Sequence, residues 1–308
     1  MIIKKPKFWD QTKPNIFAYL LTPLSKIVTF YNFIRKKETL EFPNIKIICV
    51  GNIYIGGTGK TPLSIKISEL LNSKGIKTTV IKKYYSEQKD EQLLINSRTN
   101  LISKKYRKDC ANEAINKNFK YAVFDDGLQD KSIKYNYKIC CFSSNNWIGN
   151  GYVIPAGPLR EKISSLKNFD IVFLNGPDIN NAEIKEKILK LNSKIKIFEG
   201  YYKPENINKF DVSKNYIAFS GIGNPDNFHL TLKENKFKII KYFSFPDHYN
   251  YKKYEIDNIK KFATKNNSKI VTTEKDYLRI NKELRNNIDY IKIDLEINNK
   301  SAFLDLIS

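Results

Sequence analysis

The segment at residues 51–62 reads GNIYIGGTGKTP, and its residue types suit it to binding phosphate groups. Its glycines leave room for backbone N–H groups to converge on phosphate oxygens without obstruction by a Cβ atom. The Lys60 ammonium would reach the β and γ phosphates of a nucleoside triphosphate, and the Thr61 hydroxyl would hold a Mg²⁺ ion that bridges them. The usual pattern is GxxxxGK followed by Ser or Thr, and its first glycine is replaced here by Tyr54. The predicted nucleotide-binding residues are Gly56, Gly57, Thr58, Gly59, Lys60 and Thr61.

A Mg²⁺ ion at such a loop needs a carboxylate ligand, normally at the carboxyl end of a neighbouring strand. Asp125 and Asp126 follow the apolar run at 121–124 and precede Gly127, so both fall at the end of a predicted strand. Two adjacent acids can have different partners, one binding the metal and the other contacting the loop or a water molecule. The sequence predicts a metal site formed by Thr61, Asp125 and Asp126 and leaves the assignment between the two acids open.

The elements around the loop follow the order strand, loop, helix. Residues 45–50 form an apolar run, and residues 62–73 carry apolar side chains at helical spacing before Gly75. Further short apolar runs alternate with lysine-rich stretches long enough for helices. This alternation predicts an α/β fold of the P-loop NTPase type, with a mostly parallel sheet and helices on both faces. The further runs lie at 78–81, 121–124, 139–142 and 171–174.

The length of 308 residues favours two domains. Residues 201–214 are the best candidate linker, since they contain Pro204 and several Asn and Lys residues. Beyond them, apolar runs at 216–219, 269–272 and 290–293 predict a smaller C-terminal α/β domain. The predicted divisions are an N-terminal apolar segment at 1–38, a P-loop kinase domain at 39–205 and the smaller domain at 206–308.

The N-terminal stretch at 15–34 is about as long as a membrane span and carries only Lys26 as a charged residue. Basic residues flank it on both sides, which favours the cytoplasmic leaflet. Four interpretations stay open: a single span, a helix lying in the membrane interface, a hairpin broken at Pro23, and a buried helix of a soluble protein. We favour peripheral or monotopic attachment to a membrane surface.

The chain carries 53 Lys and Arg against 32 Asp and Glu, a formal net charge of +21. This excess favours contact with an anionic membrane or a phosphorylated substrate, although a Lys- and Asn-rich coding bias also produces it. The hydrophobic content of 41% excludes a disordered chain. No two of the four cysteines have CxxC spacing, so we expect reduced, structural thiols rather than a zinc site. We expect no nucleic acid partner and no obligate protein partner.

Seven sequence blocks, in order along most of the chain, resemble the tetraacyldisaccharide 4'-kinases of lipid A synthesis. The resemblance implies an ATP- and Mg²⁺-dependent kinase that phosphorylates the 4' hydroxyl of a tetraacyl glucosamine disaccharide 1-phosphate, an anionic glycolipid. It also implies a location at the cytoplasmic face of the bacterial inner membrane. The blocks are VGNIYIGGTGKTP from Val50, DEQLL from Asp90, FDDGLQ from Phe124, GNGYVIPAGPLRE from Gly149, FSGIGNPDNF from Phe219, FPDHYNY from Phe245 and TTEKDYLRI from Thr272.

The resemblance also implies further site residues. In the family, the acid that matches Asp90 pairs with the histidine that matches His248, and such a pair can orient or deprotonate the attacking hydroxyl. Arg160 and Glu161 close the PAGPLRE block, where Arg160 could neutralise the transferring group and Glu161 could bind a sugar hydroxyl or a metal-bound water. The candidate catalytic residues are therefore Lys60, Asp90, Arg160, Glu161 and His248. A further polar cluster lies at 273–276, and its role stays open.

Three departures from the family pattern concern the acceptor side of the site. Asp130 stands where DDGLQ is usually followed by histidine, and Lys89 stands where glycine usually precedes Asp90. The Ser-Arg-Gly-Tyr stretch expected after the second strand reads KKYY at residues 82–85. These changes place the fine specificity in question and leave the phosphate loop intact.

Two other functions compete with this interpretation. One is a P-loop NTPase switch, or a kinase that acts on a different acceptor. Guanine-binding switches usually carry Asn or Thr, Lys, any residue and then Asp, whereas residues 273–276 read TEKD with lysine directly before aspartate. The other is a basic binding protein without catalysis, which would leave the phosphate loop and the two adjacent acids unexplained.

Overall fold

A computed structural model of the chain describes residues 5–34, 39–85, 89–176, 181–223, 225–247 and 249–308. The chain forms two compact units. The larger unit comprises Met1–Lys83, Thr99–Tyr201 and Glu296–Ser308, and the smaller unit comprises Tyr84–Arg98 and Tyr202–Leu295. Residues 84–98, which the predicted divisions place in the kinase domain, thus group with the smaller unit. The chain crosses from one unit to the other after Lys83, after Arg98, after Tyr201 and after Leu295, and the last two of these points lie within strands.

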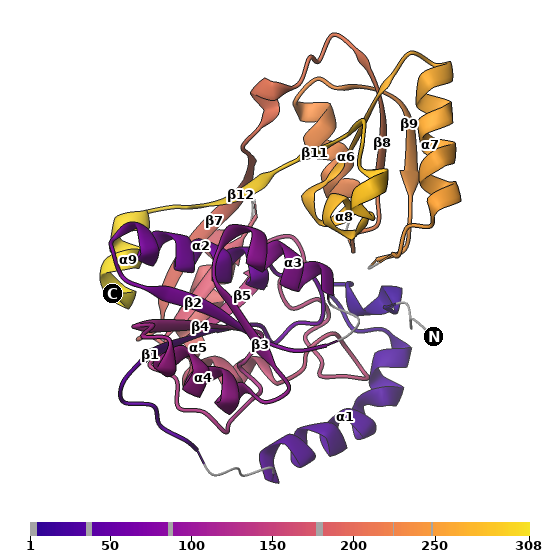
Figure 1. The fold of residues 1–308 in the computed structure, drawn as a ribbon. Coiled ribbons are helices and arrows are strands. Elements are labelled where there is room, and N and C mark those ends of the chain that lie inside the picture. The colour runs from indigo at the N-terminus through magenta and orange to yellow at the C-terminus, as the bar shows by residue number, and fades with distance from the viewer. Residues whose placement is uncertain (1–4, 35–38, 86–88, 177–180, 224, 248) are drawn as a thin grey trace. The chain divides into compact units, whose positions relative to one another are not determined.

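The larger unit is built on an eight-stranded sheet in the order β12-β7-β6-β5-β1-β4-β2-β3. The ladders from β3 through to β7 are all parallel. Figure 1 shows α2 on one face of the sheet and α4 on the other, as a mostly parallel sheet requires. The strands are β1 (Lys46–Gly51), β2 (Thr78–Lys83), β3 (Leu101–Lys104), β4 (Tyr121–Asp125), β5 (Tyr137–Ser143), β6 (Ile171–Asn175), β7 (Lys196–Pro204) and β12 (Ile293–Ile297). The helices are α1 (Ile16–Ile34), α2 (Lys60–Ser73), α4 (Arg107–Asn116), α5 (Asn181–Leu191) and α9 (Lys300–Ile307).

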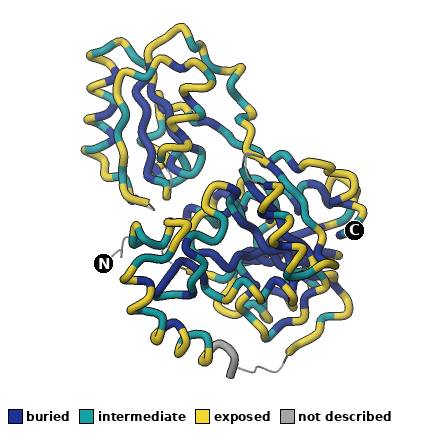
Figure 2. The backbone as a smooth tube through the Cα atoms, turned by 180° about the vertical axis from the view of Figure 1, so that it is seen from behind, coloured by how far each residue is buried: buried dark blue, intermediate teal, exposed yellow. Residues whose placement is uncertain are grey.

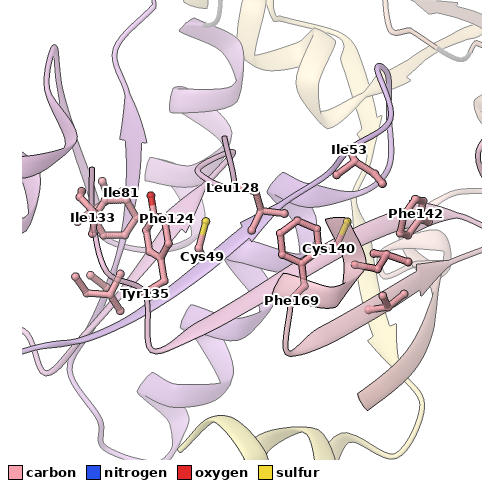
Figure 3. Packing of buried hydrophobic residues seen from close by; sticks show 14 of the residues in the cluster. Cys49, Ile53, Ile81, Phe124, Leu128, Ile133, Tyr135, Cys140, Phe142 and Phe169 are labelled. Carbon is pink, nitrogen blue, oxygen red and sulfur yellow. The ribbon is translucent and has the colours of Figure 1, made fainter. Parts of the chain in front are cut away.

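The central strands of this sheet are buried on both faces, which is why they read as continuous apolar runs in the sequence. The core beside them includes Phe124, Tyr135 and Cys49 (Figure 3). The Phe124 and Tyr135 rings meet edge to face, with centroids 5.7 Å apart. All four cysteines are free and buried, and burial raises the pKa of the Cys110 thiol to about 11. The cysteines therefore act as small core residues, as the sequence predicts.

The smaller unit contains a four-stranded parallel sheet in the order β11-β10-β8-β9. On α7, Ile256, Ile259 and Ala263 form a buried stripe, because positions three and four residues apart share one face of a helix. Its strands are β8 (Asn215–Ser220), β9 (Lys238–Ser244), β10 (Lys269–Thr273) and β11 (Ile288–Ile291). Its helices are α3 (Lys89–Arg98), α6 (Pro225–Glu234), α7 (Lys253–Lys265) and α8 (Glu274–Arg279).

Helix α1 runs without a break through Pro23, which excludes the hairpin among the alternatives left open by the sequence. One side of the helix packs on the larger unit: Ala18 is fully buried, and the Ser25 hydroxyl donates to the Val153 carbonyl oxygen at 2.7 Å. The other side is exposed, as the largely yellow tube of this helix in Figure 2 shows. Within the described part of the chain, no helix has both the length and the apolar character needed to cross a membrane. The exposed apolar residues are Ile16, Phe17, Tyr19, Leu20, Leu24, Ile27, Phe30 and Tyr31.

Helix α9 is held on the large sheet by Phe303, which is fully buried with its ring centroid 5.0 Å from that of Phe198 and 6.4 Å from that of Phe173. We expect Phe303→Ala to lower the free energy of unfolding by about 3–5 kcal/mol, because it removes a large buried ring and leaves a cavity. Urea denaturation followed by circular dichroism measures the loss. Ser301→Ala on the exposed side of the same helix is the control and should change stability by less than about 0.5 kcal/mol. A Phe303 variant as stable as this control would contradict the assignment.

Candidate active site

The phosphate loop connects β1 to the N-terminus of α2 in the larger unit. Gly56 has φ of 131° and Gly59 has φ of 88°, backbone conformations that side chains with a Cβ rarely adopt. A Cβ built on Gly57 would meet nothing within 4 Å, so this position stays open toward a ligand. Lys60 is the first residue of α2. The backbone dipoles at the N-terminus of this helix favour a bound anion. The backbone of the loop is therefore shaped to accept phosphate groups.

Two buried side chains hold the loop in this shape. The Asn52 side-chain amide donates to the Tyr54 carbonyl oxygen at 2.6 Å and to the Thr58 hydroxyl oxygen at 2.9 Å. Tyr54, which replaces the usual first glycine, is buried, and its hydroxyl donates to the Asp10 carboxylate. The Lys5 ammonium lies 4.4 Å from the centroid of the Tyr54 ring. The tyrosine thus ties the loop to the N-terminal segment without entering the glycine-rich stretch.

Asp125, at the end of β4, lies directly beside α2. Its carboxylate is fully buried, and its Oδ2 accepts a hydrogen bond from the Thr61 hydroxyl at 2.9 Å. The same oxygen accepts a hydrogen bond from the Lys82 ammonium at 2.7 Å, and both of these side chains are buried. The structure therefore brings together the predicted pair Thr61 and Asp125 and adds a lysine to it.

Asp126, the next residue, turns toward the PAGPLRE block. Its backbone φ is 60°, a conformation that aspartate tolerates better than most residues. Its Oδ1 accepts a hydrogen bond from Arg160 Nη1 at 3.0 Å. Burial raises the pKa of this carboxyl, but the positive charges of Lys60, Arg160 and Lys82 outweigh burial, and the net pKa lies below its ordinary value. The carboxylate is thus ionised at neutral pH, with three cations around it.

Gln129 joins the residues at the mouth of the loop. Its side-chain amide donates to the Asn52 carbonyl oxygen at 2.9 Å and to Glu161 Oε1 at 3.2 Å, and its Oε1 accepts from Arg160 at 3.1 Å. Arg160 and Glu161 are therefore fixed next to each other beside Asp126, rather than forming an isolated surface ion pair. Gln129 belongs to the FDDGLQ block, but nothing in the sequence alone indicates this role.

Asp130, which departs from the family pattern, has partners of its own. Its Oδ2 accepts from Arg107 Nη1 at 3.2 Å, and its Oδ1 accepts from the Ser132 hydroxyl at 2.6 Å. Arg107 also donates to the Asp126 carbonyl oxygen at 2.5 Å. Asp130 thereby holds the turn that positions Asp126.

The donor set around Thr61 and Asp125 fits a Mg²⁺ ion. This ion prefers hard oxygen ligands and is usually held by one or two carboxylates together with substrate phosphates and water, not by a cage of protein groups. The described residues contain no group of three or more His, Cys, Asp or Glu side chains placed to hold a metal. Thr61, Asp125 and Asp126 offer oxygens of this kind, with Lys82 as a competing partner of Asp125.

Asp90 lies in a second cluster of charges, inside the smaller unit. It is on α3 and nearly fully buried, and its Oδ2 accepts a hydrogen bond from Arg279 Nη2 on α8 at 2.6 Å. Arg279 Nη1 donates to Asp276 Oδ1 at 2.9 Å, and the Tyr251 hydroxyl donates to the same oxygen at 2.9 Å. Arg279 therefore bridges two buried carboxylates and fixes the orientation of Asp90.

The polar cluster at 273–276 explains why residues 84–98 belong to the smaller unit. Glu274 pairs with Arg98, and the Lys275 ammonium donates to Glu91 Oε1 at 3.3 Å. The Thr273 hydroxyl accepts from the Asp276 backbone N–H at 3.1 Å and caps α8. His248, predicted as the partner of Asp90, lies outside the described residues. His229, to which the sequence gives no role, is exposed on α6.

Three of the residues that shape the site were not predicted as such, and the reasons differ. Lys82 was noted only as a departure, although a lysine at the buried end of a strand needs a carboxylate partner. Arg107 lies in no recognised block, so only the structure reveals its contact with Asp126. Arg279 follows the TEKD cluster at the last position of a short helix, and a search for basic residues three positions after a buried acid would have found it.

Loss of Arg279 should destabilise the smaller unit. Arg279→Met leaves Asp90 and Asp276 buried without their shared cation, so we expect the free energy of unfolding to fall by about 3–5 kcal/mol. Arg279→Lys should recover only part of this loss, because one ammonium cannot reproduce the two-armed contact. Urea titration followed by tyrosine fluorescence measures the loss, with the exposed Lys282→Met as control. Equal stability of Arg279→Met and the control would show that the bridge contributes little.

Comparisons with known proteins agree over almost the whole chain. A family model described as "Tetraacyldisaccharide-1-P 4'-kinase" matches residues 17–308. The chain is similar to the tetraacyldisaccharide 4'-kinase of Pelagibacter ubique (strain HTCC1062), with 49% identity over 300 residues, 97% of this chain and 96% of the relative. It is 34% identical over 330 residues to that of Rickettsia canadensis (strain McKiel), covering 98% of this chain and 96% of the relative.

Among solved structures, the chain is similar to a crystal structure of LpxK from Aquifex aeolicus in complex with ATP, with a TM-score of 0.74 and 20% identity. The match covers 95% of this chain and 98% of that one, and at this identity it supports the fold alone. The fold is that expected from the sequence, a P-loop NTPase-like, mostly parallel sheet with helices on both faces. From the match to the family model and the extent of the relatives, this chain belongs to the tetraacyldisaccharide-1-P 4'-kinase family.

Proposed function

We propose that this protein transfers the γ-phosphoryl group of ATP to the 4' hydroxyl of a tetraacyl glucosamine disaccharide 1-phosphate in lipid A synthesis. One observation carries the proposal. In a chain that belongs to this kinase family, a glycine-rich loop at the N-terminus of α2 stands beside a buried carboxylate, Asp125, that accepts a hydrogen bond from Thr61 at 2.9 Å. This is the arrangement that phosphoryl transfer from a nucleoside triphosphate requires.

Phosphoryl transfer depends mainly on positioning and on stabilising negative charge. The backbone N–H groups of residues 56–61 would hold the phosphate oxygens, and Lys60 would neutralise charge on the β and γ phosphates. Arg160, held by Asp126 and Gln129, would stabilise charge on the transferring group. Its neighbour Glu161 would accept a hydrogen bond from a sugar hydroxyl.

Mg²⁺ is the cation that we propose for this site. Thr61 would hold it together with one or both of Asp125 and Asp126, and the bound ion would supply charge neutralisation between the β and γ phosphates.

The acceptor hydroxyl needs a base, and we propose that Asp90 and His248 act together in this role. Arg279 holds Asp90 as a buried, oriented carboxylate, since its Nη2 donates to Asp90 Oδ2 at 2.6 Å. A carboxylate beside an imidazole fixes its tautomer and raises its basicity. The imidazole would then take the proton of the 4' hydroxyl as its oxygen attacks the γ phosphorus, and the bond from that phosphorus to the β,γ-bridging oxygen would break to release ADP.

We further propose that helix α1 lies on the cytoplasmic surface of the inner membrane. Its exposed side carries eight large apolar residues, which a water-exposed helix rarely presents together. The net charge of +21 would add attraction to anionic headgroups and to the phosphate of the acceptor. The helix would therefore bring the enzyme to its lipid substrate.

Lys60→Ala tests the proposed reaction. We expect loss of more than about 99% of the transfer of labelled γ-phosphate from ATP to tetraacyldisaccharide 1-phosphate in detergent micelles, because the ammonium that neutralises the β and γ phosphates is removed. Lys74→Ala, at the opposite end of α2, is the matched control and should retain full activity. ATP hydrolysis by the wild-type protein without labelling of the lipid would reject this acceptor and favour another one.

Vesicle binding of the purified protein tests the proposal that α1 lies on the membrane. Leu20→Glu with Ile27→Glu places two charges on the exposed side of α1, where the wild-type side chains are 69% and 64% exposed. We expect the double variant to bind anionic phospholipid vesicles more than about tenfold less tightly in a flotation assay, because burial of two large apolar side chains is lost. Leu189→Glu on α5, also exposed, is the control and should bind like the wild type. Undiminished binding of the double variant would exclude α1 as the attachment surface.

A further inference from the structure

Lys82 is a departure from the family pattern that the structure places inside the nucleotide site. It stands where the pattern has serine, at the end of β2, and the parallel register of β2 and β4 sets it opposite Asp125. Its side chain is only 4% exposed, and its Nζ lies 2.7 Å from Asp125 Oδ2. A buried ammonium is costly unless a carboxylate compensates it, so this lysine is committed to the Asp125 carboxylate.

The lysine changes the charge of the site. The buried carboxylate of Asp125 lies among hydroxyl donors, since Thr61 donates to it at 2.9 Å and Ser64 at 3.4 Å. Three cations, Lys60, Lys82 and Arg160, face the carboxylates of Asp125 and Asp126. A third carboxylate, Glu161, shares Gln129 with Arg160, so the charges of this cluster balance. With a neutral residue in place of Lys82, the carboxylates would exceed the cations by one.

The lysine also lowers the negative charge that Asp125 presents to a divalent cation. Asp125 Oδ2 already accepts from Thr61 and from Lys82, whereas the other oxygen, Oδ1, accepts from Ser64 alone among the described residues, at 3.4 Å. Lys82 thus supplies, from the chain itself, part of the positive charge at the site.

We propose that Lys82 is a built-in cation of the nucleotide site, which lets this protein bind the triphosphate of ATP with little help from a divalent ion. The proposal rests on the proposed function, because it concerns the same phosphate loop. It makes Lys82 a binding residue for the anionic nucleotide and not merely a structural partner of Asp125.

The test measures binding of the β,γ-imido analogue of ATP by titration calorimetry, once with EDTA and once with saturating Mg²⁺. For the wild-type protein we expect affinities within about tenfold of each other. Lys82→Gln keeps an N–H donor for Asp125 but removes the charge, so it should weaken binding in EDTA by about tenfold or more and binding with Mg²⁺ by much less. Lys82→Arg should bind like the wild type in both conditions. The control is Lys83→Gln, whose side chain points to the other face of the strand.

The outcomes separate this inference from the proposed function. Equal weakening with and without Mg²⁺, or no weakening, would overturn the role of Lys82 while lipid phosphorylation by the wild type still stood. Absence of nucleotide binding by the wild type in both conditions would overturn both. If thermal unfolding shows that Lys82→Gln does not fold, Lys82→Ser, the residue of the family pattern, replaces it. If neither variant folds, the test rests on the wild-type protein alone. An affinity for the ATP analogue that is about a thousandfold lower in EDTA than with Mg²⁺ would then contradict the proposal.

Discussion

The parallel register of β1 and β4 is the constraint on which the nucleotide site depends. It sets Val50 beside Asp125, so the chain leaving β1 and the acids ending β4 emerge at the same edge of the sheet. The carboxylate of Asp125 can then meet the first turn of α2, where Thr61 donates to it. Because β2 flanks β4 on its other side, Lys82 reaches the same oxygen. The loop, the acid and the lysine are thus positioned by three adjacent strands, β1, β4 and β2.

In the smaller unit, Arg279 has a comparable organising role. A guanidinium has several donors in a fixed plane, so it can satisfy two carboxylates at once, and here it links Asp90 on α3 to Asp276 on α8. Asp276 in turn receives a hydrogen bond from the Gly221 backbone N–H at 3.1 Å. Residues 84–98 are remote in sequence from the rest of this unit, and ion pairs join them to it, among them Arg98 with Glu274, Lys275 with Glu91 and Arg279 with Asp90. The last of these contacts fixes the direction in which the Asp90 carboxylate points.

The parts of the site that follow from local sequence could be predicted, and those that follow from strand neighbours could not. The glycine spacing, Lys60 and Thr61 form one continuous segment whose chemistry is readable without a fold. The strands were recognised because buried parallel strands are continuous apolar runs. The burial of Lys82 depends on β2 lying next to β4, which no local pattern states. The assignment of residues 84–98 to the smaller unit depends on ion pairs such as Arg279 with Asp90, which join positions remote in sequence.

Two features of the larger unit, the exposed side of α1 and the charged surroundings of the phosphate loop, match the two substrates of the proposed reaction. Helix α1 presents apolar side chains to the outside while Ser25 and Ala18 fix it to the larger unit, so its exposed side is not a poorly packed part of the core. The phosphate loop, with Lys60, Lys82 and Arg160 around it, concentrates positive charge, which matches the triphosphate of ATP. The exposed side of α1 has no counterpart in the nucleotide, and the acyl chains of a lipid acceptor match it. A soluble acceptor would leave the apolar helix unexplained, which is why a lipid is the acceptor class that this arrangement favours.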